Sequence, residues 1–357
     1  MKIAFITIHI GVNVGSNLQA IATSEILKEA GHEPLLINYI PPRSTYQRYW
    51  KVARKNIVKF VWRIINFALF HYLTKKFENY QKKYCEMTQP IYDTDNFAEA
   101  LPHADIYMTS SDQVWNFRHN EGFDYHYFFK GVEGRKVSYA SSIGMDDLSS
   151  EEAALMKAEL KQFNKISVRE DIAVELLKDM GIESVQHIDP TLMLTCDRWK
   201  PYMSNKVIKE PYLLVYHPYN IKDINAIYDV ARAVAKKKHL RVVTFTWGYG
   251  PVRLADKTIY YASSGDFLSL MYHADFIITN SFHGTAFSVN FNKPFFVLAP
   301  SHFSSRITSI GRLLHIEDRF ITSVPSDEDI EKAIDYESVN KILEKERIRA
   351  MEYLKSL

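Results

Sequence analysis

The stretch that decides the fold is Phe276-Ile277-Ile278-Thr279-Asn280-Ser281-Phe282-His283-Gly284, in the second half of the chain. Its first four residues are a short apolar run of the kind that forms a buried strand, and a polar turn follows at once. The turn leads into residues 284–291, which we expect to form a helix. A strand that passes through a polar turn into a helix is the repeating unit of α/β proteins with a parallel sheet.

The same unit recurs along both halves of the chain, which predicts an α/β fold of two facing, doubly wound, Rossmann-like domains. Ligands of such sheets bind beyond the carboxyl ends of the strands. We expect strands at residues 2–9, 33–39, 104–110, 136–141, 165–168, 184–188, 211–217, 241–246, 276–279 and 294–298, and helices at residues 18–30, 150–163, 169–180, 224–238, 266–273, 284–291 and 306–314.

The length of 357 residues is too great for one ordinary core and suits two. A polar stretch at 197–210, which contains Pro201, separates the halves. We therefore predict an N-terminal domain at 1–200 and a C-terminal domain at 201–339. A helix at 340–357 would fold back across the domains, and a helical excursion at 43–84 would leave the first domain.

Composition narrows the class of protein. The net charge of +2 is nearly balanced, which argues against a nucleic-acid partner. The two cysteines, Cys85 and Cys196, have no metal-ligand spacing and suit free thiols in a reducing cytoplasm. No apolar stretch reaches the roughly 18 residues of a membrane span, and the apolar start lacks a small-residue cleavage site. We expect a cytoplasmic protein.

The excursion between Arg43 and Lys83 is rich in lysine, arginine and aromatic residues and contains a single acid, Glu78. A basic amphipathic helix with aromatic residues is typical of segments that bind an anionic membrane surface. The alternative is a helix that packs on its own domain and exposes a basic edge. In the first interpretation the membrane contacts are Arg54, Lys55, Trp62, Ile65, Lys59 and Arg63.

The turn at 280–284 has the features of an anion site. A polar turn at a helix start offers backbone N–H groups and the positive end of the helix dipole to a phosphate or carboxylate. His283 adds a side chain that can donate a proton there. The alternative is that Asn280 or Ser281 caps the helix and that His283 is an ordinary surface histidine.

Two segments of the first half carry comparable groups. Residues 110–116 follow an expected strand and combine a carboxylate, amides and the Trp115 indole, which suits a sugar pocket; the alternative is an Asx turn. Arg169 lies between an expected strand and helix, where its guanidinium can hold a carboxylate or phosphate with two hydrogen bonds. The alternative for Arg169 is a salt bridge to Glu170 or Asp171.

Six short segments, each at a strand end, together resemble the polysaccharide pyruvyl transferase family. The resemblance covers about residues 2–314, apart from the basic excursion. The segments are Asn17-Leu18-Gln19-Ala20, Ser111-Asp112-Gln113-Val114-Trp115-Asn116, Ser141-Ser142-Ile143-Gly144, Ser167-Val168-Arg169-Glu170, Asp189-Pro190-Thr191-Leu192 and Ser281-Phe282-His283-Gly284.

The resemblance implies a fold similar to glycosyltransferase-B and a reaction on phosphoenolpyruvate, with the acceptor bound by the N-terminal domain and the donor by the C-terminal domain. The pyruvyl group would be transferred to two hydroxyls of a sugar, in a surface polysaccharide (exopolysaccharide) or its lipid-linked precursor, with formation of a cyclic ketal and release of phosphate. Arg169 and His283 correspond to a donor-binding arginine and a histidine of the family. Some members carry an arginine two residues before that histidine, where this chain has Ser281, and we expect Arg306 to replace it.

The chemistry of phosphoenolpyruvate fits these residues. It carries nearly three negative charges, so a metal-free site needs converging cations and N–H donors. His283 is the expected general acid and Asp112 the expected base. We expect no metal and no cofactor beyond phosphoenolpyruvate as co-substrate. The expected donor-binding residues are Arg169, Asn280, Ser281, His283, Gly284 and Arg306, and the acceptor-binding residues are Asn17, Gln19, Asp112, Gln113, Trp115 and Asn116.

Two other functions remain open. A glycosyltransferase that uses a nucleotide sugar would have the same architecture, and fold alone does not separate the two activities. A non-catalytic sugar- or lipid-binding protein on the same scaffold would have lost donor cations, and Ser281 is in keeping with such a loss. If the acceptor is lipid-linked, the enzyme would work at the inner face of the cell membrane, with the segment 43–83 as its contact.

Overall fold

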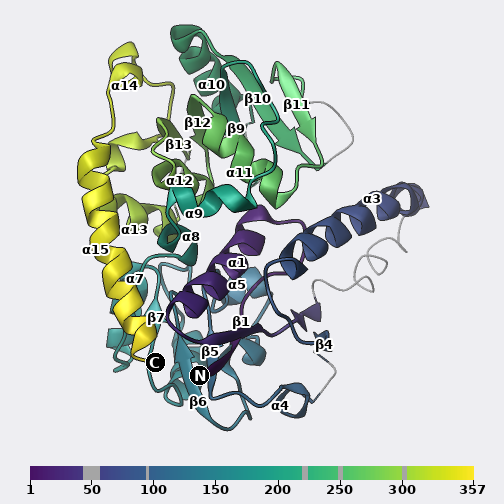
Figure 1. The fold of residues 1–357 in the computed structure, drawn as a ribbon, viewed down its shortest axis with the longest axis vertical. Helices are drawn as coiled ribbons and strands as arrows, with labels where there is room; N and C mark the ends of the chain where they lie inside the picture. Colours follow the sequence, from purple (N-terminus) through teal and green to yellow (C-terminus); the bar gives the residue numbers. More distant parts are fainter. Residues whose placement is uncertain (43–56, 94–95, 219–223, 248–251, 300–303) are drawn as a thin grey trace. The chain divides into compact units, whose positions relative to one another are not determined.

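The computed structural model describes residues 1–42, 57–93, 96–218, 224–247, 252–299 and 304–357. The chain forms two compact units (Figure 1). Unit 1 comprises Met1–Pro190 together with Arg349–Leu357, and unit 2 comprises Thr191–Ile348. Each unit is described by itself.

Unit 1 is built on a parallel sheet with the strand order β2-β1-β5-β6. Single bridges from Val137 to Lys165 and from Ser141 to Val168 continue the sheet towards a further parallel pair, β7 and β8. Another parallel pair, β3 and β4, stands beside β2. The strands are β1 (Lys2–Ile6), β2 (Glu33–Leu36), β3 (Tyr39–Ile40), β4 (Ile91–Tyr92), β5 (Ile106–Thr109), β6 (Arg135–Ser138), β7 (Ser167–Val168) and β8 (Val185–Gln186).

The three predicted helices of unit 1 outside the excursion are present as α1, α6 and α7; α6 starts at the predicted Ser150, whereas α1 and α7 start elsewhere, and the short helices α4 and α5 were not predicted. Helix α1 begins before the predicted residue 18 because the Asn13 side chain accepts hydrogen bonds from the backbone N–H groups of Gly15 and Ser16 and caps it. Ser149 and Glu152 form a reciprocal capping pair at the start of α6. The helices are α1 (Val14–Glu29), α3 (Ile57–Lys82), α4 (Phe97–Ala100), α5 (Phe117–Asn120), α6 (Ser150–Leu160) and α7 (Asp171–Asp179).

The described part of helix α3 packs on unit 1. Leu73, Phe77 and Gln81 are buried, and the Asn17 amide of α1 donates to the backbone oxygen of Phe77. Arg54 and Lys55 lie outside the described residues, and so do the side chains of α3 before Phe67. Within the described ranges, no helix is long and apolar enough to cross a membrane.

Unit 2 has a six-stranded, fully parallel sheet with the order β11-β10-β9-β12-β13-β14. The chain starts in the middle of the sheet, builds outwards to β11, and then returns to the other side of β9 with β12. This is the doubly wound order of dinucleotide-binding domains. The strands are β9 (Tyr212–Tyr216), β10 (Arg241–Thr246), β11 (Lys257–Tyr260), β12 (Phe276–Thr279), β13 (Phe295–Leu298) and β14 (Phe320–Ile321).

The division between the units falls between Pro190 and Thr191, earlier than the predicted boundary at 200. The segment after Thr191 belongs to unit 2 because the Asn290 amide donates to the backbone oxygens of Thr191 and Leu194, and Trp199 packs edge-on against Phe287. The helices of unit 2 are α9 (Cys196–Trp199), α10 (Ile224–Lys238), α11 (Ser264–His273), α12 (Phe282–Asn290), α13 (Ser305–Leu314) and α14 (Asp327–Glu331), while α8 (Pro190–Met193) spans the division.

The last helix, α15 (Tyr336–Lys355), begins before the predicted residue 340 and belongs to both units. In unit 2 the Arg347 guanidinium donates to the backbone oxygen of Leu192. In unit 1 the Tyr353 hydroxyl donates to the backbone oxygen of Ser138 at 2.8 Å. The end of the chain is therefore an integral part of unit 1.

Candidate functional site

In the sheet of each unit, the chain first adds strands on one side of its first strand and then returns to add strands on the other side. The reversal point lies between the first strand and the first strand added after the return. In unit 2 this point lies between β9 and β12, and in unit 1 it lies between β1 and β5. α/β proteins bind their ligands at the carboxyl ends of the strands at this point. Asn280–Gly284 follows β12, and Asp112 follows β5, so both predicted segments lie at such points.

In unit 2, helix α12 starts in close contact with the end of its strand. The Thr279 hydroxyl donates to the backbone oxygen of Tyr216 at 2.7 Å and accepts from the Ser281 N–H at 3.1 Å. A Cβ atom on Gly284 would lie only 2.2 Å from the Thr279 hydroxyl oxygen. Glycine at 284 is therefore required for this approach, which fixes the position of the helix start.

The start of α12 has no side-chain cap. Ser281 occupies the cap position, but its side chain makes no capping hydrogen bond, although its backbone oxygen accepts from the Thr285 hydroxyl at 2.9 Å. The alternative in which Ser281 caps the helix through its hydroxyl is therefore wrong. First-turn N–H groups without a side-chain cap are suited to an anionic ligand.

His283 lies in this first turn, 5% exposed and edge-on to the Phe282 ring. It is thus a buried residue of the turn, not the exposed surface histidine of the alternative interpretation. Arg306 is buried in the first turn of α13, a helix that packs against α12. Unit 2 therefore brings Asn280, Ser281, His283 and Gly284 into one turn, and Arg306 lies on the neighbouring helix α13, which packs against α12.

Sequence reasoning missed His217, which directly follows β9. Tyr216 lies opposite Thr279 in register, so His217 and Asn280 leave the sheet from adjacent strands. Burial lowers the pKa of His217, and its Nε2 lies 3.3 Å from the Tyr228 hydroxyl. The strand-end rule that selected Asn280 would also have selected His217.

In unit 1, Arg169 is part of a buried ion network. Its Nη1 donates to the Asp189 carboxylate at 2.7 Å, and its Nε donates to the Glu170 carboxylate at 3.1 Å. Burial alone would lower the pKa of Arg169, but Glu170, Asp189 and Asp112 raise it above its ordinary value. The salt bridge to Glu170 anticipated as the alternative exists, and Asp189 is a second partner. Arg169 belongs to unit 1, whereas His283 belongs to unit 2.

Asp112 adopts a left-handed backbone conformation, φ +73°, directly after β5. Its carboxylate accepts the Ser16 hydroxyl at 2.6 Å and the Gln113 N–H at 2.9 Å. Ser111 donates to Asp189, which links this turn to the network around Arg169. Asp112 is thus fixed at the end of the strand beside the start of α1.

The other predicted acceptor residues are buried and hydrogen-bonded within unit 1, so they support the structure around the site. Trp115 is fully buried, donates to the backbone oxygen of Tyr127 and stacks on Phe128. The prediction that its indole forms the wall of an open sugar pocket is wrong for this conformation, because the ring is part of the core. Asn116 donates to Gln113 and caps α5 through its side-chain oxygen.

Asn17 and Gln19 are also buried in α1. Asn17 donates to the backbone oxygen of Phe77, and Gln19 donates to the Thr7 hydroxyl and to the backbone oxygen of Ile8. Both side chains therefore hold the segment after β1 and helix α3 in place.

Unit 1 contains a small cavity at the carboxyl end of β1, with a volume of about 130 Å³. Sequence reasoning missed the residues that line it, although several directly follow β1 and fall under the strand-end rule. Its walls include His9, Asn13, Ser16, Tyr39, His119 and Tyr127.

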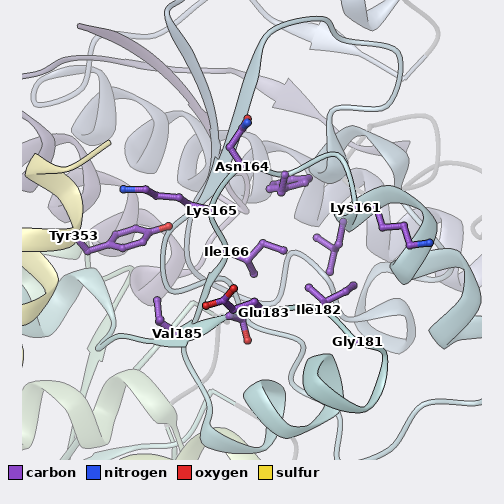
Figure 2. A pocket seen from close by; sticks show the side chains of 12 residues that line it. Lys161, Asn164, Lys165, Ile166, Gly181, Ile182, Glu183, Val185 and Tyr353 are labelled. Atoms are coloured by element: carbon purple, nitrogen blue, oxygen red, sulfur yellow. The ribbon is translucent and has the colours of Figure 1, made fainter.

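A larger cavity of unit 1, about 530 Å³, lies at the opposite, amino ends of β7 and β8. Figure 2 shows Lys165 and Tyr353 at one side of it and Lys161 at the other, with Glu183 between them. Lys165 donates to the hydroxyl and backbone oxygens of Ser356. This cavity is separate from the candidate site, because it lies at the amino ends of the strands and not at their carboxyl ends. In the described ranges, no group of three or more His, Cys, Asp or Glu side chains is arranged to hold a metal ion.

Solved structures define the class of fold. The chain is similar to UDP-GlcNAc 2-epimerase from Methanocaldococcus jannaschii, with a TM-score of 0.54, 12% identity and coverage of 96% of this chain and 92% of that one. It is also similar to UDP-N-acetylglucosamine 2-epimerase from Rickettsia bellii (TM-score 0.53, 13% identity, 99% and 97% covered) and to Arabidopsis thaliana UGT89C1 complexed with UDP-L-rhamnose (0.51, 10%, 99% and 98%). The fold is thus of the glycosyltransferase-B type, as the sequence predicted.

The family follows from the sequence itself. The profile of the polysaccharide pyruvyl transferase family matches residues 13–302, which include both turns at the reversal points. The chain belongs to this family. No curated protein matches the chain.

Proposed function

We propose that the protein transfers the pyruvyl group of phosphoenolpyruvate to two hydroxyls of one sugar and releases phosphate. The observation that carries the proposal is the turn after β12, where α12 begins without a side-chain cap and presents His283. Membership of the polysaccharide pyruvyl transferase family supports a transferase with a saccharide acceptor.

The proposed reaction places distinct demands on the site. One sugar hydroxyl adds to the enol carbon and loses its proton to a base, while the methylene carbon receives a proton from an acid and becomes a methyl group. The second hydroxyl then displaces phosphate from the same carbon, and its proton leaves with the phosphate or a base. Both C–O bonds of the ketal form on one carbon, and one C–O bond to phosphate breaks.

In the proposal, the α12 turn and Arg306 bind the donor's negative charges, and a protonated His283 delivers the proton to carbon. Ser281 stands where some family members carry an arginine, and its backbone N–H already donates to the Thr279 hydroxyl, so Arg306 supplies the missing cation in the proposal. Arg169 is the further donor contact that the family resemblance implies, although Asp189 and Glu170 already share its charge. No metal or cofactor is required in this scheme.

The direct test is phosphate release from phosphoenolpyruvate with a panel of lipid-linked sugars. His283→Ala and His283→Asn should both lower the rate by about 100-fold or more, because a general acid contributes roughly 10²–10⁴. His315→Asn is the matched control, since it removes an exposed histidine of unit 2. His315 has a left-handed backbone conformation, which asparagine tolerates. Folded His283 variants with an unimpaired rate would remove this role.

The second candidate function is nucleotide-sugar transfer, which the glycosyltransferase-B type fold allows. Ligand-induced thermal shift separates the two activities. Phosphoenolpyruvate should raise the unfolding temperature and uridine diphosphate should not; the opposite pattern favours glycosyl transfer. If neither ligand has an effect while a sugar does, the protein is a non-catalytic saccharide-binding relative.

We propose a cytoplasmic enzyme that meets the inner membrane face through the basic segment 43–83. Deleting this segment is a poor test, because Leu73 and Phe77 belong to the buried surface of unit 1. Replacing Arg54, Lys55, Lys59 and Arg63 by glutamine retains that surface. Flotation of the wild type with vesicles rich in anionic lipid, and its loss in this variant, is the expected result. Equal flotation of both proteins would exclude the contact.

A further inference from the structure

The small cavity at the end of β1 has no role in the scheme above. We propose that it binds one neutral ring of the sugar acceptor, that Ser16 accepts a hydrogen bond from a hydroxyl of this ring, and that Asp112 acts through Ser16. The inference rests on the proposed transfer to sugar hydroxyls. It changes the expected role of Asp112 from direct contact to a partner behind the contacting residue.

The size of the cavity limits its ligand. Its volume of about 130 Å³ is well below the roughly 300–1,000 Å³ of sites that enclose a drug-sized molecule. A single saccharide ring or part of one is the appropriate scale. The rest of a longer acceptor would have to lie outside the cavity.

The residues that line the cavity suit a neutral ligand better than the anionic donor. The described residues that line it include no lysine or arginine. Burial lowers the pKa of His9, which favours the neutral imidazole. A molecule with nearly three negative charges would meet no lysine or arginine among these residues, whereas a neutral polyhydroxyl compound needs no counter-charge.

The start of α1 supports the same conclusion. The Asn13 side chain accepts from the Gly15 and Ser16 N–H groups at 3.0 and 3.2 Å, so these amides already have partners. Helix α12 of unit 2 has no such cap. The start of α1, whose first amides are already satisfied by Asn13, therefore suits a neutral ligand better than an anion.

Aromatic rings form part of the walls, as in sites that recognise the apolar faces of small ligands with a few polar groups. The Tyr39 hydroxyl already donates to Asp124 at 3.1 Å, which fixes the ring. Tyr127 is almost fully buried beside it, with the two rings edge to face. These tyrosines supply a rigid apolar wall, while Ser16 supplies the polar contact.

The hydrogen bond from Ser16 to Asp112 determines that Ser16 acts as an acceptor towards the ligand. Ser16 donates its O–H to the Asp112 carboxylate at 2.6 Å, a short, charge-assisted bond, so its oxygen is left as an acceptor for a sugar hydroxyl. Ser16 lines the cavity, and Asp112 is not among the lining residues. When the sugar hydroxyl attacks, its proton passes to the Ser16 oxygen while the Ser16 proton passes to Asp112. Ser16 ends neutral and Asp112 ends protonated.

Saturation-transfer NMR with methyl hexopyranosides, which differ in the orientation of their hydroxyls, tests the binding. At least one glycoside should give a signal with the wild type, and Ser16→Ala should weaken its binding about tenfold. Ser24→Ala, which removes another buried serine of α1, is the control and should bind normally. No signal from the wild type, or equal binding by all three proteins, would overturn the assignment.

Asp112→Asn tests the relay. Asparagine tolerates the left-handed backbone at 112 and still accepts the Ser16 hydroxyl, but it takes up no proton. Glycoside binding and KM should stay within about twofold, while kcat for phosphate release falls by about 100-fold and loses the acid limb of its pH profile. An unchanged kcat would refute the relay. Thermal shift by phosphoenolpyruvate on the same samples reports separately on the proposed donor.

Discussion

Replacing Arg169 by methionine should strongly destabilise unit 1. The substitution removes the cation that Asp189 and Glu170 share and leaves both carboxylates without it. The side chain of Arg169 is 3% exposed, and those of both acids are 0% exposed, so water does not screen the lost interaction. Removal of one partner from a buried ion pair typically costs about 3–5 kcal/mol.

Thermal unfolding followed by circular dichroism measures this effect. For a domain of 150–250 residues, each kcal/mol lowers the unfolding temperature by about 2–4 °C, so we expect a decrease on the order of 10 °C. Arg118→Met is the matched control, because Arg118 pairs with Asp147 on the surface, where both side chains are well exposed, and it should unfold like the wild type. Adding Asp189→Asn to Arg169→Met removes one of the stranded charges and should restore part of the stability.

An Arg169→Met protein that unfolds at the wild-type temperature would refute this reasoning. It would mean that the carboxylates do not depend on Arg169, which would leave its charge available to the donor. Arg169→Lys adds a second readout, because lysine keeps the charge but not the forked geometry that serves two acids. Activity lost by any of these variants bears on donor binding only when the folded fraction is measured alongside it.

Three further predictions concern other positions. Gly284→Ala should destabilise unit 2 by about 2 kcal/mol in urea unfolding, because the new Cβ would collide with the Thr279 side chain, and wild-type stability would contradict this. Burial, with a smaller contribution from Arg349, lowers the pKa of His187 from 6.5 to about 4, so the unfolded chain binds a proton that the folded chain does not. Stability should therefore fall as the pH falls through this window, by up to about 3 kcal/mol, and urea unfolding of His187→Asn should show a smaller loss between pH 7 and pH 4 than the wild type. Asn290→Ala should lower the calorimetric unfolding temperature of unit 2, because two buried backbone oxygens, of Thr191 and Leu194, lose their donor; no change would show that water replaces it.

The sequence predicted the interior of the fold better than its edges. Strands β10 and β12 and helix α10 have the predicted bounds, because their apolar residues face a buried sheet. Strands β11 and β14 were missed, since both lie at sheet edges, are partly exposed and lack a continuous apolar run. Helix α12 starts at Phe282, before the predicted Gly284, because its first turn is set by packing against Thr279.

The candidate site was predicted in position but not in contacts. A strand end is visible as the end of an apolar run, which is why the turn after β12 and the segment around Asp112 were found. The partner of Arg169 lies twenty residues away at Asp189, and the two meet only when β7 and β8 pair. The burial of Trp115 likewise depends on Phe128 and Tyr127, which no local pattern joins to it.

Both ends of the chain belong to unit 1, since Met1 precedes β1 and Leu357 follows the last turn of α15. Unit 1 is assembled from two segments that are separate in the gene, whereas unit 2 is one uninterrupted segment from Thr191 to Ile348. A gene fragment for that segment encodes a complete unit. A fragment that stops at Pro190 does not, because it lacks the donor of the hydrogen bond from Tyr353 to Ser138. Expression of unit 1 alone would therefore need residues 349–357 supplied again, as a fusion or as a separate peptide.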